Sequence, residues 1–123
     1  MAWNFTADRP IYLQLMEEIM LRVVTGVYGP GEKLPSVREL AAEAEVNPNT
    51  MQRALAELEA TGMINAQRTS GRYVTHDENL LASYRRKLAE GYLRETLQKL
   101  EPLGYSQEEI LDMLRKIREE DGV

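Results

Sequence analysis

The sequence predicts a mostly α-helical protein with one small β-hairpin. Apolar residues recur at helical spacing along most of the 123-residue chain, whereas residues 63–75 change to a strand-like pattern. Two capping boxes, at Ser36 and Ser106, each pair a serine with a glutamate three residues later and mark helix starts. The apolar content of 43% and charged content of 28% are ordinary for a globular protein.

The first predicted helix covers residues 9–25. We expect Asp8 to cap it and Pro10 to occupy its first turn, while Gly26 provides the C-terminal stop. The apolar face of this helix consists of Ile11, Leu15, Met16, Ile19, Met20 and Val23. The glycine- and proline-rich run 28–31 that follows predicts a turn.

Two short helices come next. The capping box of Ser36 opens a helix over residues 36–44, and Asn47 and Pro48 open another that ends at Gly62. The predicted inward-facing residues are Val37, Leu40, Ala41 and Ala44 in the former helix and Met51, Ala54, Leu55 and Leu58 in the latter. Two short helices separated by so few residues predict a helix-turn-helix.

Residues 63–75 are predicted to form a β-hairpin, in which two apolar segments flank the polar stretch 68–71. A hairpin directly after a helix-turn-helix is a wing. Because isolated hairpins are barely stable in water, the wing must pack against the helices. The prediction is therefore a winged helix-turn-helix domain over residues 1–76.

Residues 77–123 are predicted to form a two-helix tail, interrupted at Pro102 and Gly104 and resumed at the capping box of Ser106 and Glu109. The helix pair has too few apolar residues for a core of its own. It must bury its apolar stripe against the domain or against another copy of itself, so we expect a dimerisation tail. The expected dimerisation residues are Leu81, Leu88, Leu93, Leu97, Ile110, Leu114 and Ile117.

The segment 29–41, GPGEKLPSVRELA, closely resembles the signature of the GntR family of bacterial regulators. The resemblance continues through VNPNT (46–50), RAL (53–55), LE (58–59) and the wing sequence RTSGRYV (68–74), which lacks the family's usual first glycine. It covers about residues 9–76. The short tail makes the chain similar to the YtrA subfamily, whose members are typically dimeric repressors, often of transport operons.

The resemblance implies a sequence-specific DNA-binding transcriptional regulator that acts as a dimeric repressor of its own or a neighbouring operon, with transport operons among the candidate targets. The positions that match the family's DNA contacts are Ser36, Arg38, Asn47, Asn49, Thr50, Gln52, Arg53, Arg68 and Gly71. Asparagine, glutamine and arginine can make bidentate contacts to base edges, and helix N-termini attract phosphate.

Each of these residues also has a purely structural interpretation. Ser36 and Asn47 can act as helix caps alone, and Gly71 can be needed only for its backbone conformation. Arg53 can pair with Glu57 one helical turn later. The remaining polar residues that this interpretation treats as ordinary surface side chains are Arg38, Asn49 and Thr50.

Glu45 departs from the family pattern, because glycine is common at this position of the inter-helix turn. If the backbone is left-handed there, glutamate costs roughly 1 kcal/mol. Its acidic group is also unhelpful near phosphate.

The formal net charge of −5 argues against nucleic acid, since most DNA-binding proteins carry a basic footprint. Between residues 47 and 75 the excess of positive charge comes from Arg53, Arg68 and Arg72. DNA affinity must therefore come from a small, focused patch, with weak non-specific binding. The alternative is a winged-helix protein-interaction module that does not bind DNA. The acidic net charge is compatible with such a module.

Other function classes find little support. We expect no enzyme, because no nucleophile–base pair or spaced carboxylate dyad can be assembled. We expect no metal site and no cofactor, since cysteine is absent and His76 is the sole histidine. Packing of an amphipathic helix explains Tyr84 and Tyr92 better than an effector pocket does. The place that remains for a small effector is the dimer interface. The absence of a signal sequence or membrane-length apolar run predicts a cytoplasmic protein.

Overall fold

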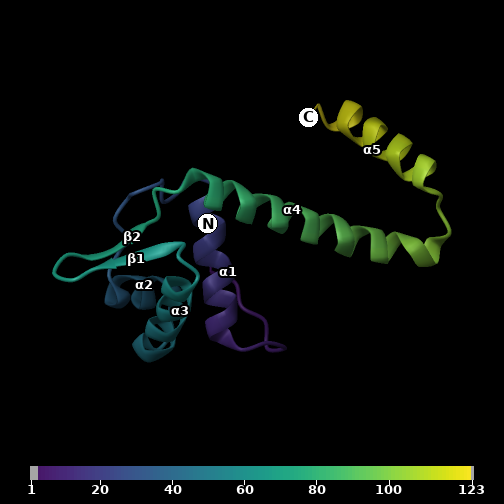
Figure 1. The fold of residues 1–123 in the computed structure, drawn as a ribbon. Helices are drawn as coiled ribbons and strands as arrows, with labels where there is room; N and C mark the ends of the chain where they lie inside the picture. The colour runs from purple at the N-terminus through teal and green to yellow at the C-terminus, as the bar shows by residue number, and fades with distance from the viewer. Residues whose placement is uncertain (1–2, 123) are drawn as a thin grey trace. The chain divides into compact units, whose positions relative to one another are not determined.

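The computed structural model describes residues 3–122 and forms two compact units, one up to Arg85 and the other from Arg86. The N-terminal unit contains α1 (Ile11–Val24), α2 (Val37–Ala44), α3 (Pro48–Ala60), β1 (Ile64–Gln67) and β2 (Gly71–Val74) (Figure 1). Helix α4 (Glu78–Leu100) begins in this unit and continues into the C-terminal unit, which adds η1 (Glu101–Leu103) and α5 (Gln107–Asp121). The predicted fold class, mostly helical with a small hairpin, is confirmed.

The start of α1 differs from the prediction. Asp8 does not cap this helix: Pro10 occupies the N-cap position, and Asp8 instead accepts a hydrogen bond from the Thr6 hydroxyl. The buried Gln14 fixes the entry of the chain, because its Oε1 accepts a hydrogen bond from the Thr6 N–H at 2.8 Å and its Nε2 donates to the Thr6 carbonyl at 2.9 Å. Gly26, at φ 87°, follows the end of the helix as predicted.

The starts of α2 and α3 follow the predicted capping. The Ser36 Oγ accepts a hydrogen bond from the Glu39 N–H, and the Glu39 Oε1 accepts one from the Ser36 N–H, both at 3.1 Å. At the next helix, the Asn47 Oδ1 accepts a hydrogen bond from the Asn49 N–H at 2.8 Å. Both short helices are therefore held at their N-termini by their own side chains.

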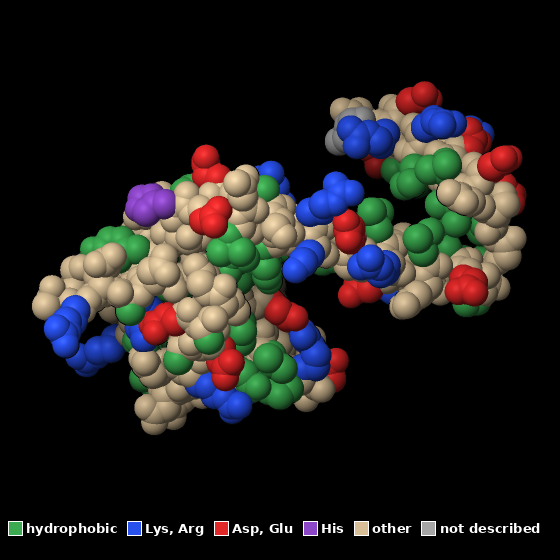
Figure 2. Space-filling model, in the orientation of Figure 1, with side chains coloured by type: hydrophobic (Ala, Val, Ile, Leu, Met, Phe, Trp, Pro, Cys, Tyr) green, Lys and Arg blue, Asp and Glu red, His purple; other side chains and the backbone are tan. Residues whose placement is uncertain are grey.

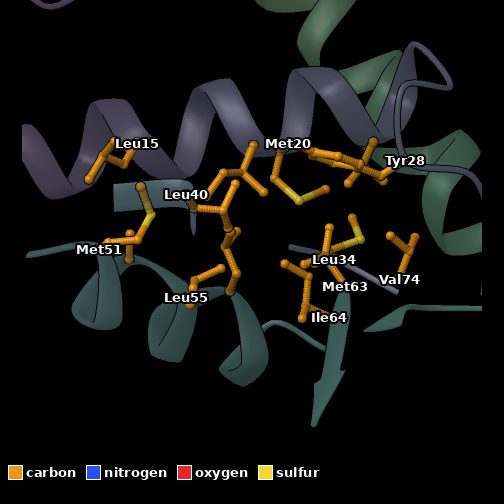
Figure 3. Close-up of a cluster of buried hydrophobic side chains, with 14 of the residues drawn as sticks. Leu15, Met20, Tyr28, Leu34, Leu40, Met51, Leu55, Met63, Ile64 and Val74 are labelled. Carbon is orange, nitrogen blue, oxygen red and sulfur yellow. The ribbon is translucent and has the colours of Figure 1, made fainter. Parts of the chain in front are cut away.

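The core of the N-terminal unit lies between α1, α2, α3 and the hairpin. In Figure 3, Leu15 and Met20 of α1 point toward the side of α3 that carries Leu55. The buried hydrophobic residues are Leu15, Ile19, Met20, Val23, Tyr28, Leu34, Leu40, Ala41, Ala44, Met51, Ala54, Leu55, Leu58, Met63, Ile64 and Val74. The hairpin thus contributes to the core, which confirms that the wing (residues 63–75) packs against the helices.

The wing is held on both edges of β2. On one edge, β1 and β2 pair antiparallel around a turn at residues 68–70. On the other edge, the Leu34 N–H donates to the Arg72 carbonyl and the Val74 N–H donates to the Glu32 carbonyl, both at 2.9 Å. This second pairing, which periodicity did not predict, fixes the wing to the segment that leads into α2.

Arg22 ties three segments of the N-terminal unit together from a buried position. Its Nη1 donates to Glu43 Oε1 at 2.9 Å, its Nε donates to Glu18 Oε2 at 3.0 Å, and its guanidinium lies 4.1 Å from the centroid of the Trp3 ring. Burial lowers the pKa of Arg22, but the hydrogen bonds with Glu43, Tyr28 and Glu18 outweigh it and raise that pKa above its ordinary value. Arg22 therefore stays charged and orients α1 toward α2.

The C-terminal unit has no comparable core. Neither α4 nor α5 contains a buried residue among the positions described. Gly104, at φ 80°, separates the two helices, and the Ser106 Oγ accepts a hydrogen bond from the Glu109 N–H at 3.2 Å in the predicted capping box. Along the described chain no helix combines the length and the apolar character needed to cross a membrane.

Candidate nucleic-acid interface

The turn between α2 and α3 is built on a left-handed residue. Glu45 has φ 57° and ψ 46°, and it is the one non-glycine residue with positive φ in the described part of the chain. The turn is closed by the Val46 N–H, which donates to the Ala41 carbonyl at 3.0 Å. The left-handed conformation lets only three residues separate α3 from α2, and with glutamate at this position the backbone is strained.

Helix α3 and its N-cap residue together carry five of the nine candidate DNA contacts. Its inner face is buried, whereas Asn49, Gln52 and Arg53 are exposed and Thr50 is half-buried. Asn47 precedes them as the N-cap, and its amide nitrogen stays available because capping uses the oxygen. The first two turns of α3 therefore present amide, hydroxyl and guanidinium groups beside the positive end of the helix dipole.

Arg53 has an unexpected partner. Its guanidinium carbon lies 3.7 Å from the centroid of the Tyr12 ring in α1, and no ion pair with Glu57 forms among the described residues. Stacking occupies a face of the guanidinium and leaves the N–H groups along its edge free to donate. The within-helix ion pair with Glu57 is therefore not the role of Arg53.

The N-terminus of α2 and the wing enclose a second part of the interface, a groove of about 400 Å³. Ser36 and Arg38 line it from the helix side, and Ser70 and Gly71 line it from the wing. Arg38 is exposed and forms no ion pair with any residue that the structure describes. The fold thus gathers candidate contacts from α2 and the wing that lie more than 30 residues apart in the sequence.

Lys33 lines the same groove, although it was not among the contact residues expected from the sequence. Its Cε lies 3.2 Å from the position that a Cβ on Gly71 would occupy, and Gly71 itself has φ 111°. The ammonium also contributes to lowering the pKa of Glu39, after the larger effects of the hydrogen bonds from Ser36. A single lysine next to a motif gives no periodic signal, so only its position in the fold reveals it.

The two wing arginines differ in their availability. Arg68, at the tip, is exposed, and Figure 2 shows basic side chains at the end of the N-terminal unit where the wing lies. Arg72 instead forms an ion pair with Glu59 of α3. Its charge is therefore largely neutralised, which removes it from the patch that the sequence suggested and leaves Arg68 with Arg53 of α3.

The expected dimerisation residues differ in their exposure to solvent. Leu81 packs half-buried against the core of the N-terminal unit, and Leu88 and Ile110 are partly exposed. Four others, Leu93, Leu97, Leu114 and Ile117, are 47–58% exposed. Other exposed apolar residues, outside the expected dimerisation set, are Tyr92, Leu103, Tyr105 and Leu111. Figure 2 shows hydrophobic side chains open to solvent on the C-terminal unit.

His76 lies beside the turn at Gly31, and Tyr84 and Tyr92 both lie in α4. The ring of His76 lies directly over Gly31, and within the described residues no three metal-ligating side chains come together. Tyr84 packs against the core, and Tyr92 is 52% exposed.

Comparison with known proteins identifies the family of this chain. Residues 11–74 match the model of the gntR family of bacterial regulatory proteins. The uncharacterized HTH-type transcriptional regulator YhcF of Bacillus subtilis is 35% identical over 116 residues, or 94% of this chain and 96% of YhcF. The transcriptional repressor YtrA of the same bacterium is 41% identical over 71 residues, or 58% of this chain and 55% of YtrA.

Solved structures show the same similarity. A GntR family transcriptional regulator from Listeria monocytogenes superposes with a TM-score of 0.84 at 39% identity, covering 91% of this chain and 98% of its own. The DNA-binding domain of AraR, in complex with operator ORX1, gives a TM-score of 0.55 at 26% identity, covering 58% of this chain and 93% of its own. The similarity is therefore extensive in both sequence and fold.

Proposed function

Because the chain belongs to the GntR family of bacterial regulatory proteins, we propose that it represses its own or a neighbouring operon as a homodimer bound to a two-fold symmetric operator. Its DNA-binding role as a transcriptional regulator follows from the family, whose members compared above are regulators and not enzymes. The name of YtrA supports repression as the mode of control.

In the proposed complex, α3 enters the major groove. Asn49, Gln52 and Arg53 then face base edges, while Ser36 and Arg38 approach from the start of α2. Arg68 reaches phosphate or the minor groove from the wing tip. One observation supports DNA contact most strongly. In an otherwise acidic protein, these polar and basic groups lie together in the groove at α2 and on the exposed side of α3.

Dimerisation is proposed to occur through residues 77–123. The observation that supports it is that eight large apolar residues of the C-terminal unit are 45–66% exposed, which is costly for a monomer. In α5 the apolar residues Ile110, Met113, Leu114 and Ile117 follow one helical stripe. A second copy of the tail would bury such a stripe, and its two-fold symmetry would present two α3 helices to half-sites about one or two helical turns apart.

Sedimentation of the full-length chain tests the dimer. We expect the wild-type protein to sediment as a dimer at micromolar concentration and the double variant Leu93→Glu/Leu97→Glu to sediment as a monomer. The matched control is Gln98→Glu, which adds a charge to an exposed position of the same helix and should leave the dimer intact. A monomeric wild-type protein, or a double variant that dimerises like the wild type, contradicts the proposal.

Mobility shifts test the operator. We expect DNA from upstream of the protein's own gene to be bound in preference to scrambled DNA, and binding to weaken when the salt concentration is raised. A reporter gene behind that DNA should be less active when the protein is present. Binding to a protein partner without any DNA shift would instead support an interaction module.

Control by a small molecule is proposed to act at the dimer interface, because a two-helix tail offers too little volume to enclose a domain-sized pocket of roughly 300–1,000 Å³. Action on chromosomal DNA also implies a cytoplasmic location. Candidate effectors should shift the monomer–dimer equilibrium in the same sedimentation assay. An effector that changes operator affinity without changing that equilibrium contradicts this part of the proposal.

A further inference from the structure

The contact between Tyr12 and Arg53 joins the outer helix of the N-terminal unit to the helix that faces DNA. Tyr12 lies in the first turn of α1, where it is half-buried and packs against the core. Arg53 lies on the exposed side of α3, and its guanidinium carbon is 3.7 Å from the centroid of the Tyr12 ring. A side chain fixed by the core thus supports an arginine at the surface.

This support has a consequence for binding. A free arginine loses rotamer freedom when a ligand immobilises it, and this loss weakens binding. Stacking on the Tyr12 ring restricts the guanidinium before DNA arrives, and only the face of its plane is used. The edge N–H groups remain available for a phosphate or for a guanine.

Helix α3 also contains a competing partner for Arg53. Glu57 lies four residues after Arg53, a spacing that commonly forms an ion pair within a helix. In the described residues Arg53 turns to Tyr12 and forms no such pair. A pair with Glu57 would engage the donor edge, whereas the aromatic ring leaves that edge open.

We propose that Tyr12 is a positioning residue for DNA recognition, which holds the Arg53 guanidinium in the orientation in which it meets the operator. The inference rests on the proposed function, because it needs Arg53 to contact DNA. Tyr12 acts through its ring and through Arg53, so its hydroxyl is dispensable. Its removal should matter only while Arg53 is present.

A double-mutant cycle on the full-length protein tests this role. The probe is a labelled duplex of the sequence that the wild-type protein selects from a library of random duplexes. We expect Tyr12→Leu to weaken binding about threefold to tenfold, because the Arg53 side chain then loses its rotamer freedom only when DNA binds. Tyr12→Phe keeps the ring and should bind like the wild type. In an Arg53→Ala background, Tyr12→Leu should cause no further loss.

Ile11→Ala is the control for a merely structural role. Ile11 neighbours Tyr12 on α1 and also packs against the core, yet it has no stacking contact with Arg53. It should lower thermal stability without weakening the binding of the folded protein. Circular dichroism of every variant at the assay temperature ensures that folded proteins are compared.

The outcomes separate the two proposals. If the wild-type protein selects no sequence, the proposed function and this inference both fail. If the wild type binds but Arg53→Ala is unaffected, or Tyr12→Leu costs the same with and without Arg53, only the positioning role fails. Equal losses for Tyr12→Phe and Tyr12→Leu would assign the effect to the hydroxyl and overturn the inference.

Discussion

The Nη1 of Arg22 donates a hydrogen bond of 2.9 Å to the Oε1 of Glu43, so a buried cation of α1 holds a half-exposed carboxylate of α2. This hydrogen bond lowers the pKa of Glu43 from its ordinary value of 4.5, against a smaller opposite effect of burial. The ionised form of Glu43 is therefore favoured in the folded protein. Its stabilising contribution is complete above about pH 4.5 and is lost as the pH falls through the lower folded pKa.

Glu43→Gln should therefore make the free energy of unfolding depend less on pH in the acidic range. At neutral pH we expect the variant to lose about 0.5–1 kcal/mol of unfolding free energy, a small amount because the Glu43 side chain is half exposed. The difference from the wild type should shrink below pH 4.5. Urea unfolding at both pH values measures it, with the exposed Glu57→Gln as control. A difference that stays constant with pH would contradict the assignment.

Glu45→Gly should stabilise the protein. Glycine adopts the left-handed conformation of this turn without a Cβ clash, although it also gains entropy in the unfolded chain, so we expect a net gain of about 0.5–1 kcal/mol. The gain should appear as a higher urea midpoint with an unchanged slope. Glu45→Ala keeps the Cβ and removes the charge, so it serves as the control. Equal gains for glycine and alanine would mean that charge, not backbone strain, is the cause.

Arg38→Ala should reduce sequence discrimination. Its planar guanidinium offers two donors to the acceptors of guanine, a contact worth about 1–3 kcal/mol of discrimination. The gap between operator and scrambled duplexes should therefore narrow. Because Arg38 is exposed and unpaired in the described structure, folding should be unaffected, as circular dichroism can check. Unchanged affinity and preference in a folded variant would exclude Arg38 as a base reader.

Arg68→Ala and Lys33→Ala should behave differently from Arg38→Ala. Arg68 at the wing tip and Lys33 in the groove beside the wing are both exposed, and we expect both to contact phosphate. Each substitution should weaken operator and scrambled DNA alike, and each should reduce the salt dependence of binding by about one ion. Titrations over a range of salt concentrations measure this slope. A selective loss of operator affinity would instead identify a base contact.

Gly71→Ala should destabilise the wing. At φ 111° an L-residue is strained, and the new methyl group would also press on Lys33, so we expect a loss of about 1–2 kcal/mol of unfolding free energy. Gly29→Ala is the matched control, because a Cβ at Gly29 meets only ordinary van der Waals contact. Thermal unfolding compares the two variants. Equal losses would show that the conformation of Gly71 is not the cause.

The elements of this protein are predictable from the sequence where the signal is local. Ser36 and Glu39 lie one turn apart, so their capping box can be recognised without the fold, and the buried faces of the first three helices follow from their period. Asp8 shows the limit of a local rule. The Thr6 hydroxyl competes for its carboxylate, and the chain enters α1 through Pro10 instead.

The exposure of the candidate site residues could be largely predicted from the sequence, but their partners could not. Asn49, Gln52 and Arg53 lie on the exposed face of α3. The contact of Arg53 with Tyr12 and that of Arg72 with Glu59, however, join distant segments of the chain. No period or spacing encodes such pairs. Lys33 was missed for the same reason, because its importance comes from β2 folding back beside it.

The pairing of β2 on both edges also bears on the speed of DNA association. The wing is hydrogen-bonded to the segment before α2 as well as to β1, so its angle to α2 is set in the free protein. An encounter with DNA then needs no ordering step in this region, and the association rate should follow diffusion and electrostatic steering. Differences in affinity among DNA sequences should accordingly appear in the lifetime of the complex.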